Sequence, residues 1–223
     1  MKTIDRALLG FGILIPFWLL LGVALTAQSY PGYSHLDQAM SQLGAVGAPT
    51  HGFSAWVNNF PLGVMFVLFA TGVARRFKAS RMALLSAALI FVHGLASFAA
   101  GYFSCDQGCA PIEPSISQQS HNLAGLVMFI SLTLAGALWA FLGKSLLLSS
   151  RFAMFSAICV ILAIVTVMLM ATAMADGHLF GLYQRLNYGV SVVWVASLAI
   201  VALQDARDKP RGAAVRAQGF RGQ

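Results

Sequence analysis

The chain has 223 residues, of which 58% are hydrophobic and only 9% are charged. Its mean hydropathy is +0.76, whereas about a quarter of the residues in soluble domains are charged. This composition excludes a soluble globular protein and indicates a membrane protein. A formal net charge of +7 would suggest a nucleic-acid partner for a soluble protein, but here basic residues beside membrane spans account for it, so we expect no nucleic-acid partner.

Six apolar runs are long enough to cross a hydrocarbon core about 30 Å thick, which takes about 20 helical residues. They cover residues 7–27, 55–73, 82–103, 121–142, 154–175 and 182–203. The first run follows two basic residues as a signal peptide would, but it is longer than the apolar core of a signal peptide, about 7 to 15 residues, so we interpret it as a retained helix. The sequence therefore predicts an all-α bundle of six transmembrane helices over residues 1–205, followed by a disordered basic tail over residues 206–223.

The basic residues predict how the helices are oriented, because Lys and Arg stay on the cytoplasmic side of short connections. Arg185 is the single basic residue of the outer side, and the other 13 of the 14 fall on the opposite side: Lys2, Arg6, Arg75, Arg76, Lys78, Arg81, Lys144, Arg151, Arg207, Lys209, Arg211, Arg216 and Arg221. We therefore expect a multi-pass protein of the cytoplasmic (inner) membrane with both termini in the cytoplasm. All five tyrosines fall at or beyond the outer helix ends, where their rings are expected at headgroup level: Tyr30, Tyr33, Tyr102, Tyr183 and Tyr188.

Two of the three cysteines lie in the outer connection between the third and fourth runs, in the sequence C-D-Q-G-C. Disulfides form and persist outside the cytoplasm, and Gly108 allows a turn that brings Cys105 and Cys109 within bonding distance. We therefore predict a disulfide. The alternative is a metal site with Asp106, His121 or Glu113 as further ligands, but the second Cys or His pair of a zinc signature is missing. No metal and no cofactor are expected.

Polar residues at the outer helix ends are candidates for a binding site. The second, fourth and sixth runs each begin with an Asn that precedes a Gly by one turn or less, at Asn59, Asn122 and Asn187. Either these are polar helix starts followed by small residues that permit close packing, or the three side chains converge on one outer-leaflet pocket. Arg185 is placed to bind a lipid phosphate or a substrate anion; the alternatives are a salt bridge and snorkelling.

Two histidines are candidates for chemistry. His121 begins the fourth run, and Ser41, His121 and Asp106 would form a Ser-His-Asp hydrolase arrangement, although no nucleophile-elbow motif is present. The alternative for His121 is a bond to loop backbone. His93 lies midway along the third run, where an ionisable residue is either functional or a neutral imidazole bonded to a neighbouring helix. A haem shared by the two histidines is not expected, because their depths in the membrane differ.

Three motifs taken together resemble a known family. They are Y-x-x-x-x-x-x-x-S-x-L-G-A-x-G-A-P at residues 33–49, F-x-C-D-x-G-C at 103–109 followed by S-H-N-L-A-G, and Q-R-L at 184–186. The chain resembles, over residues 7–203, the six-helix prokaryotic membrane proteins catalogued as domain-of-unknown-function family 998. The resemblance implies a six-helix bundle with an outer polar cluster and no settled activity; many members have S-E-L-G where this chain has Gln42. The architecture is also distantly similar to DRAM-type and Sfk-type proteins, some of them linked to lipid asymmetry.

Two functional hypotheses follow. The first is a protein that binds or modifies an outer-leaflet lipid, with the disulfide as a staple over the site; its side chains would be Ser41, Gln42, Asn59, His121, Asn122, Arg185 and Asn187. The second is a non-catalytic structural or accessory membrane protein whose outer polar residues cap helices and bond to one another. A membrane lipid is the partner we expect. The sequence leaves open whether the protein is an enzyme, which lipid it handles and which proteins it contacts.

Overall fold

The structure, a computed structural model, describes the backbone of residues 1–219 and the side chains of residues 1–205. Within these residues all regular structure is helical. The elements are α1 (Thr3–Gln28), the 3-10 helix η1 (Met40–Gly44), α2 (His51–Val57), α3 (Asn59–Arg76), α4 (Arg81–Tyr102), the 3-10 helix η2 (Gln107–Cys109), α5 (Ile116–Leu146), α6 (Ser150–Asp176) and α7 (Phe180–Gly219).

Six stretches are long and apolar enough to span a membrane, which confirms the predicted all-α architecture of six spans. They are Thr3–Gln28, His51–Arg76, Arg81–Tyr102, Ile116–Leu146, Ser150–Asp176 and Phe180–Asp205. A serine side chain begins three of them: Ser80, Ser115 and Ser149 each accept a hydrogen bond from the backbone N–H three residues further on. Each serine thereby pairs one of the N–H groups that a helix start leaves without a partner.

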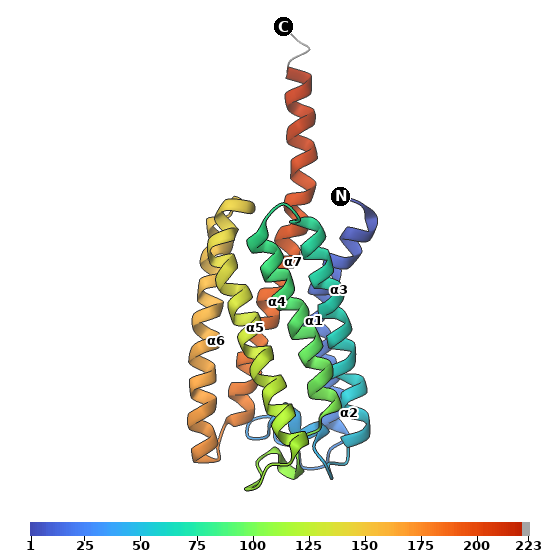
Figure 1. The fold of residues 1–223 in the computed structure, drawn as a ribbon, viewed down its shortest axis with the longest axis vertical. Helices are drawn as coiled ribbons and strands as arrows, with labels where there is room; N and C mark the ends of the chain where they lie inside the picture. Colours follow the sequence, from blue (N-terminus) through green and yellow to red (C-terminus); the bar gives the residue numbers. More distant parts are fainter. Residues whose placement is uncertain (220–223) are drawn as a thin grey trace.

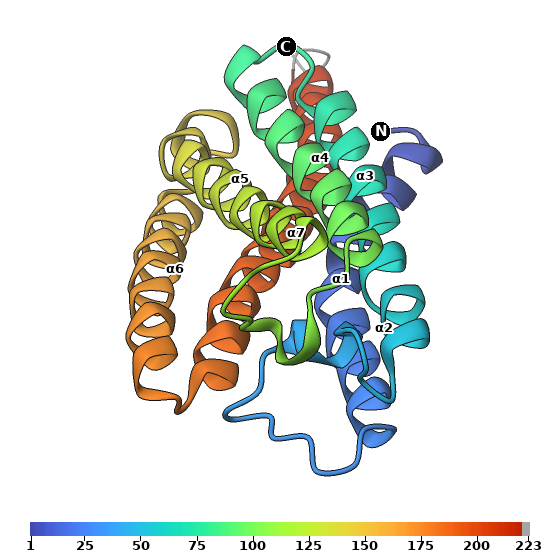
Figure 2. The same cartoon turned by 60° about the horizontal axis from the view of Figure 1, so that its bottom comes forward.

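The six spans form a ring in chain order. Each long helix packs against the next, and α7 packs back against α1. Both chain termini lie at the same end of the bundle in Figure 1, and α2 lies at the opposite end. We call the first the termini end and the second, which carries the connections 29–50, 103–115 and 177–179, the loop end. Figure 2 brings the loop end forward and shows the first two of these connections crossing the end of the ring.

Large side chains fill the half of the ring nearer the termini. The indole N–H of Trp139 in α5 donates to Ser86 Oγ in α4 (2.9 Å), and the indole N–H of Trp194 in α7 donates to Ser156 Oγ in α6 (3.1 Å). Both indoles are at most 2% exposed. A Cβ added at Gly72 would lie 2.9 Å from the backbone nitrogen of Leu9, so α1 and α3 can approach closely only because this residue has no side chain.

The second span is not one continuous helix. It breaks at Asn58, between α2 and α3, where the backbone has φ −102° and ψ −72°. The Asn58 side chain, 8% exposed, donates through Nδ2 to Thr26 Oγ1 in α1 (3.0 Å). At the other end of the chain, α7 continues as helical backbone to Gly219. The predicted disorder of residues 206–223 stays a prediction, and residues 220–223 lie outside the described part of the chain.

Candidate functional site: a polar cavity at the loop end

A cavity of about 350 Å³ lies inside the loop-end half of the ring, and residues from all six spans line it. Its size falls within the range of small-molecule sites, roughly 300–1,000 Å³. About half of the lining is apolar or glycine. The polar part includes Ser41, Asn59, His93, His121, Asn187 and Tyr188. None of the lining residues in the described part of the chain is Asp, Glu, Lys or Arg.

His93 and Tyr188 form the deepest polar pair of the cavity. The imidazole, 1% exposed, has Nδ1 3.0 Å from the carbonyl oxygen of Met128 and Nε2 3.2 Å from Tyr188 Oη. A carbonyl oxygen only accepts, so Nδ1 carries the hydrogen, and Nε2 accepts the hydroxyl hydrogen of Tyr188. His93 is thus bonded to two neighbouring helices, as one of its two interpretations expected. Tyr188 lies inside the bundle at the depth of His93, so the prediction that it sits at headgroup level is wrong.

His121 lines the cavity near the start of α5. Its Nδ1 lies 3.0 Å from the carbonyl oxygen of Ala100 and 2.8 Å from that of Phe103. Ala100 lies in the last turn of α4 and Phe103 directly follows the helix, where carbonyl groups have no helical partners. Because both partners only accept, the Nδ1–H group donates to backbone, and Nε2 is the ring nitrogen left for another group.

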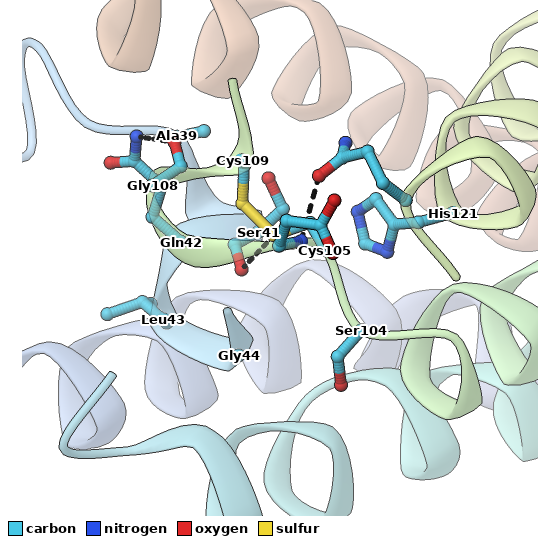
Figure 3. The surroundings of a disulfide bond; sticks show 12 residues. Ala39, Ser41, Gln42, Leu43, Gly44, Ser104, Cys105, Gly108, Cys109 and His121 are labelled. Carbon is cyan, nitrogen blue, oxygen red and sulfur yellow. Dashed lines mark hydrogen bonds between the residues drawn. A yellow bond between two sulfur atoms is a disulfide. The ribbon is translucent and has the colours of Figure 1, made fainter. Parts of the chain in front are cut away.

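Asp106 does not complete a Ser-His-Asp arrangement. Its carboxylate accepts hydrogen bonds from Ser115 Oγ (2.6 Å) and from the Ser115 backbone nitrogen (2.9 Å), and these bonds lower the pKa of the Asp106 carboxyl below its usual value. Ser41 lines the cavity from η1, as His121 does from α5, and Figure 3 shows Ser41 beside the disulfide. Within the described residues no hydrogen bond joins the three candidates, so two of them share the cavity and the carboxylate is engaged elsewhere.

A disulfide-closed turn covers the loop end of the cavity. Cys105 and Cys109 are joined as predicted, and Gly108 at the turn has a φ of +72°, which glycine adopts without strain. Two hydrogen bonds attach this turn to the first connection. The Val46 N–H donates to the Cys105 carbonyl (2.9 Å), and Gln42 Nε2 donates to the Gly108 carbonyl (2.7 Å). Figure 3 shows Gln42 and Gly108 together to the left of the disulfide. The role of Gln42 in the structure is therefore to attach one connection to the other.

The three helix-start asparagines only partly converge. Asn59 and Asn187 line the cavity, whereas Asn122 is outside its lining and accepts a hydrogen bond from Gln118 Nε2 (2.8 Å). Gln118, which the sequence interpretation did not single out, is 1% exposed and accepts the Asp106 N–H through Oε1 (2.8 Å). This pair supports the start of α5 beneath the disulfide turn.

Arg185 lies outside the lining of the cavity and holds the first connection in place. Its Nη1 donates to the carbonyls of Gln38 (3.0 Å) and Gly181 (2.8 Å), and its Nη2 donates to Tyr33 Oη (2.6 Å). The guanidinium also lies over the Tyr33 ring, 5.6 Å from its centroid. Burial of Tyr33 raises the pKa of its hydroxyl. No carboxylate among the described side chains pairs with Arg185, so the salt bridge weighed from the sequence is not formed.

Other cavity residues were missed from the sequence. Gln184, Tyr188 and Ser191 line the cavity from one stripe of α7 at spacings of four and three residues. Gln184 Oε1 also accepts the Met40 N–H at the end of the first connection (2.6 Å). Polar residues at this spacing in an otherwise apolar span share one helix face. That periodicity was the signal that would have found them.

Six apolar spans around a polar cavity define a helical-bundle protein of the multi-pass membrane class. The chain belongs to the family described as protein of unknown function DUF998, whose family model matches residues 13–201. The family resemblance predicted from the three sequence motifs is thereby confirmed. Searches among curated proteins and among solved structures found no match.

Proposed function

We propose that this protein binds a membrane lipid in the cavity at the loop end. The observation that carries the proposal is the cavity itself, which is bounded by both polar and apolar side chains from all six spans. Ligand sites are of this kind: a mostly apolar surface with a few polar groups that fix orientation. Leu126 lines the cavity and is also 53% exposed, which supports an opening toward the membrane along α5.

The polar groups near the loop end would hold the headgroup. Ser41, Asn59, Asn187 and His121 Nε2 are the sequence-predicted groups that line the cavity. Apolar side chains deeper in α5, such as Phe129 and Leu132, would contact the parts of the lipid acyl chains that lie nearest the headgroup. In this arrangement Gln42, Asn122 and Arg185 act indirectly, since they hold the cover and the cavity wall through the hydrogen bonds described above.

The proposal is for binding and includes no turnover. Ser115 holds the Asp106 carboxylate, and backbone carbonyls hold His121 Nδ1. A nucleophilic serine would need a hydrogen bond to its base, and within the described residues no hydrogen bond joins Ser41 to His121. A purely structural role is favoured by the contacts of Arg185 and Gln118, but it leaves the cavity without an occupant.

We further infer that the loop end faces the outer side of the cytoplasmic membrane. Basic residues gather at the opposite end, as the positive-inside rule requires, and two of them form ion pairs there, Arg75 with Asp5 and Arg76 with Asp205. A disulfide at the loop end fits an oxidising compartment. A reporter fused to the C-terminus is expected to be active only in the cytoplasm, and activity outside the cell would contradict this orientation.

Native mass spectrometry of the purified full chain tests the binding proposal. A Cβ added at Gly125, which lines the cavity, meets no atom within 4 Å, so the backbone there has room for the start of a side chain, and Gly125→Phe is chosen to bring a ring to the cavity. Gly10 in α1 is equally unobstructed and lies outside the lining, so Gly10→Phe is the matched control. We expect a defined lipid to co-purify with wild type and Gly10→Phe and to fall about tenfold in Gly125→Phe. Equal, unselective lipid in all three proteins would refute the proposal.

A further inference from the structure

We propose that the deep part of the cavity binds a hydroxyl group of an uncharged lipid, because four side chains there, Ser97, Asn187, Tyr188 and Ser191, donate their hydrogens inside the protein and keep only acceptors. The inference rests on the proposed function and narrows its ligand class from membrane lipids in general to lipid alcohols. It depends on the hydrogen bonds of Tyr188, on those of the side chains around it, and on the lack of charged side chains in the described lining.

Tyr188 presents only a lone pair to the cavity. The Met128 carbonyl fixes the hydrogen of His93 on Nδ1, so Nε2 has no hydrogen and accepts the Tyr188 hydroxyl. Doubly protonated His93 would be a buried cation, and no carboxylate lines the cavity to compensate it. The hydroxyl hydrogen of Tyr188 is therefore spent inside the protein, and its oxygen can only accept from a ligand.

The side chains near Tyr188 also donate their hydrogens to groups within the protein. Asn187 donates through Nδ2 to the Ala163 carbonyl (2.7 Å) and to Thr166 Oγ1 (3.0 Å), and the carbonyl partner fixes which end of the amide is nitrogen. Oδ1 is the group that remains. Ser191 Oγ donates to the Asn187 carbonyl (3.1 Å), so its hydrogen is also spent.

Ser97 lies one turn of α4 nearer the loop end than His93, and it too is left with acceptors only. Its Oγ donates to the Asn59 carbonyl (2.8 Å) and keeps only lone pairs. Together with Tyr188, Asn187 and Ser191, it makes a group of four acceptors from α4 and α7 in the lining of one cavity. A ligand that brings only acceptors, such as a quinone or an ester carbonyl, would leave these four without a hydrogen and would gain no hydrogen bond from them.

The lining also excludes a charged group at this depth. A phosphate would bring negative oxygens against lone pairs, with no cationic side chain in the described lining to compensate them. An ammonium would find acceptors but no counter-charge. A hydroxyl group supplies the missing hydrogen without a charge, and the apolar half of the lining suits the chains attached to it. The geometry therefore favours a lipid alcohol over a phospholipid headgroup in this part of the site.

Four probes separate the possibilities in titrations of the purified full chain in detergent, followed by native mass spectrometry. They are dioctanoylglycerol, its O-methyl ether, dioctanoyl phosphatidic acid and glycerol. We expect dioctanoylglycerol to bind about tenfold more tightly than the ether, since the ether lacks the hydrogen that the acceptors need. Phosphatidic acid is expected to bind at least as weakly as the ether. Glycerol is expected not to bind; if it bound as tightly as dioctanoylglycerol, a soluble polyol would replace the lipid as the ligand and overturn the proposal as stated.

Variants locate the discrimination at Tyr188. Tyr188→Phe removes one of the four acceptors but leaves His93 Nε2 free to accept, and is expected to lower the alcohol-to-ether ratio about threefold. Tyr183→Phe makes the same change on the same helix outside the lining and is expected to keep the wild-type ratio. Ser191→Ala removes a second acceptor while leaving the His93 pair intact, and is expected to lower the ratio about threefold; it serves as the test if Tyr188→Phe does not fold.

The two proposals fail in different ways. If wild type binds the alcohol and the ether equally, the hydroxyl site is overturned and lipid binding in the cavity stands. The proposed function itself fails if neither lipid probe binds wild type and if Gly125→Phe retains as much co-purifying lipid as wild type.

Discussion

The two halves of the bundle differ in their packing: one is filled with side chains and the other encloses a cavity. In the half nearer the termini, indoles such as Trp139 and Trp194 fill the ring, and each spends its N–H on a serine of the neighbouring helix. In the loop-end half the same six helices enclose a cavity of about 350 Å³, lined by residues such as His93 and Tyr188 whose hydrogen bonds are made to one another and to backbone.

The difference separates scaffold from site. Helices in lipid gain little from burying apolar surface, so the packed half is held by close contacts and a few interhelical hydrogen bonds. Once that half fixes the helix positions, the other half can remain hollow, provided that its polar groups are paired and its open end is covered. The cover is made of two loops: Arg185 holds the first to α7, Gln42 attaches the first to the second, and the disulfide closes the turn of the second. Changes in the two halves should therefore have different consequences.

The largest effect on stability is expected from Trp139→Ala. The indole is fully buried, bonds to Ser86, and packs edge-to-face on Phe77 with ring centroids 5.1 Å apart. Its removal leaves a void and should cost about 3 kcal/mol of folding free energy, at the low end of the range for buried aromatic residues. Phe141→Ala, on the same helix but 79% exposed, should cost far less. Thermal unfolding in detergent measures both, and similar losses would contradict a packed scaffold.

Arg185→Met should loosen the cover of the cavity by about 2 kcal/mol while leaving the packed half intact. The change removes the guanidinium hydrogen bonds to the Gln38 and Gly181 carbonyls and to Tyr33. Hydrogen exchange should accelerate in residues 33–39 and stay unchanged in α3.

Arg185→Lys distinguishes a clamp from an anion site. Lysine keeps the charge but cannot reach the same carbonyls and hydroxyl with one planar group. If Arg185 acts as a clamp, Lys should behave like Met in hydrogen exchange. Exchange at the wild-type rate in Arg185→Lys, combined with loss of an anionic lipid in Arg185→Met, would instead restore the headgroup role considered from the sequence.

Removal of the disulfide should have an effect of about the same size, confined to the loop end. The bond closes a loop of five residues, for which chain entropy gives about 2 kcal/mol. The double variant Cys105→Ser, Cys109→Ser should weaken the hydrogen bonds from Val46 and Gln42 to this turn and accelerate amide exchange at Val46. Cys159→Ser, within the bundle, is the control and should leave exchange at Val46 unchanged.

What the sequence could predict depended on whether the signal was local. Span positions and the Cys105–Cys109 pair follow from hydropathy and spacing along the chain. Which polar side chains meet depends on how each helix is rotated and on where its partners lie. Asn59 and Asn187 reach the cavity and Asn122 does not, although all three stand in similar motifs.

Depth was the second quantity that the sequence could not supply. Position along a helix separated His93 from His121, yet both line one cavity because it extends from the loop end to the middle of α4. Tyr188 was placed at headgroup level because it lies near the start of its span, but it is eight residues beyond the start of α7, about 12 Å along the helix. The break at Asn58 likewise depends on a tertiary partner, Thr26 in α1.

The smallest effect is expected on acidification, again at the loop end alone. Asp37 accepts hydrogen bonds from the Leu179 backbone nitrogen, from Ser34 and from His178, and these bonds, the Leu179 bond most of all, lower the pKa of the Asp37 carboxyl. A carboxyl whose pKa is lower in the folded protein stabilises it at pH values above the unfolded pKa, about 3.9, and this contribution is lost as the pH falls through the folded value. Protection of the α6–α7 connection from hydrogen exchange, taken relative to the intrinsic exchange rate at each pH, should therefore decrease as the pH falls below about 4.

Asp37→Asn should remove this pH dependence, because an amide does not titrate in this range. Asp106→Asn is the matched control: its carboxylate pairs with Ser115, so the change should alter exchange at the start of α5 and leave the α6–α7 connection as in wild type. If acid accelerated exchange equally in the termini-end half, the pH response would come from the whole bundle, and the distinction between a packed scaffold and a separately held cover would be lost.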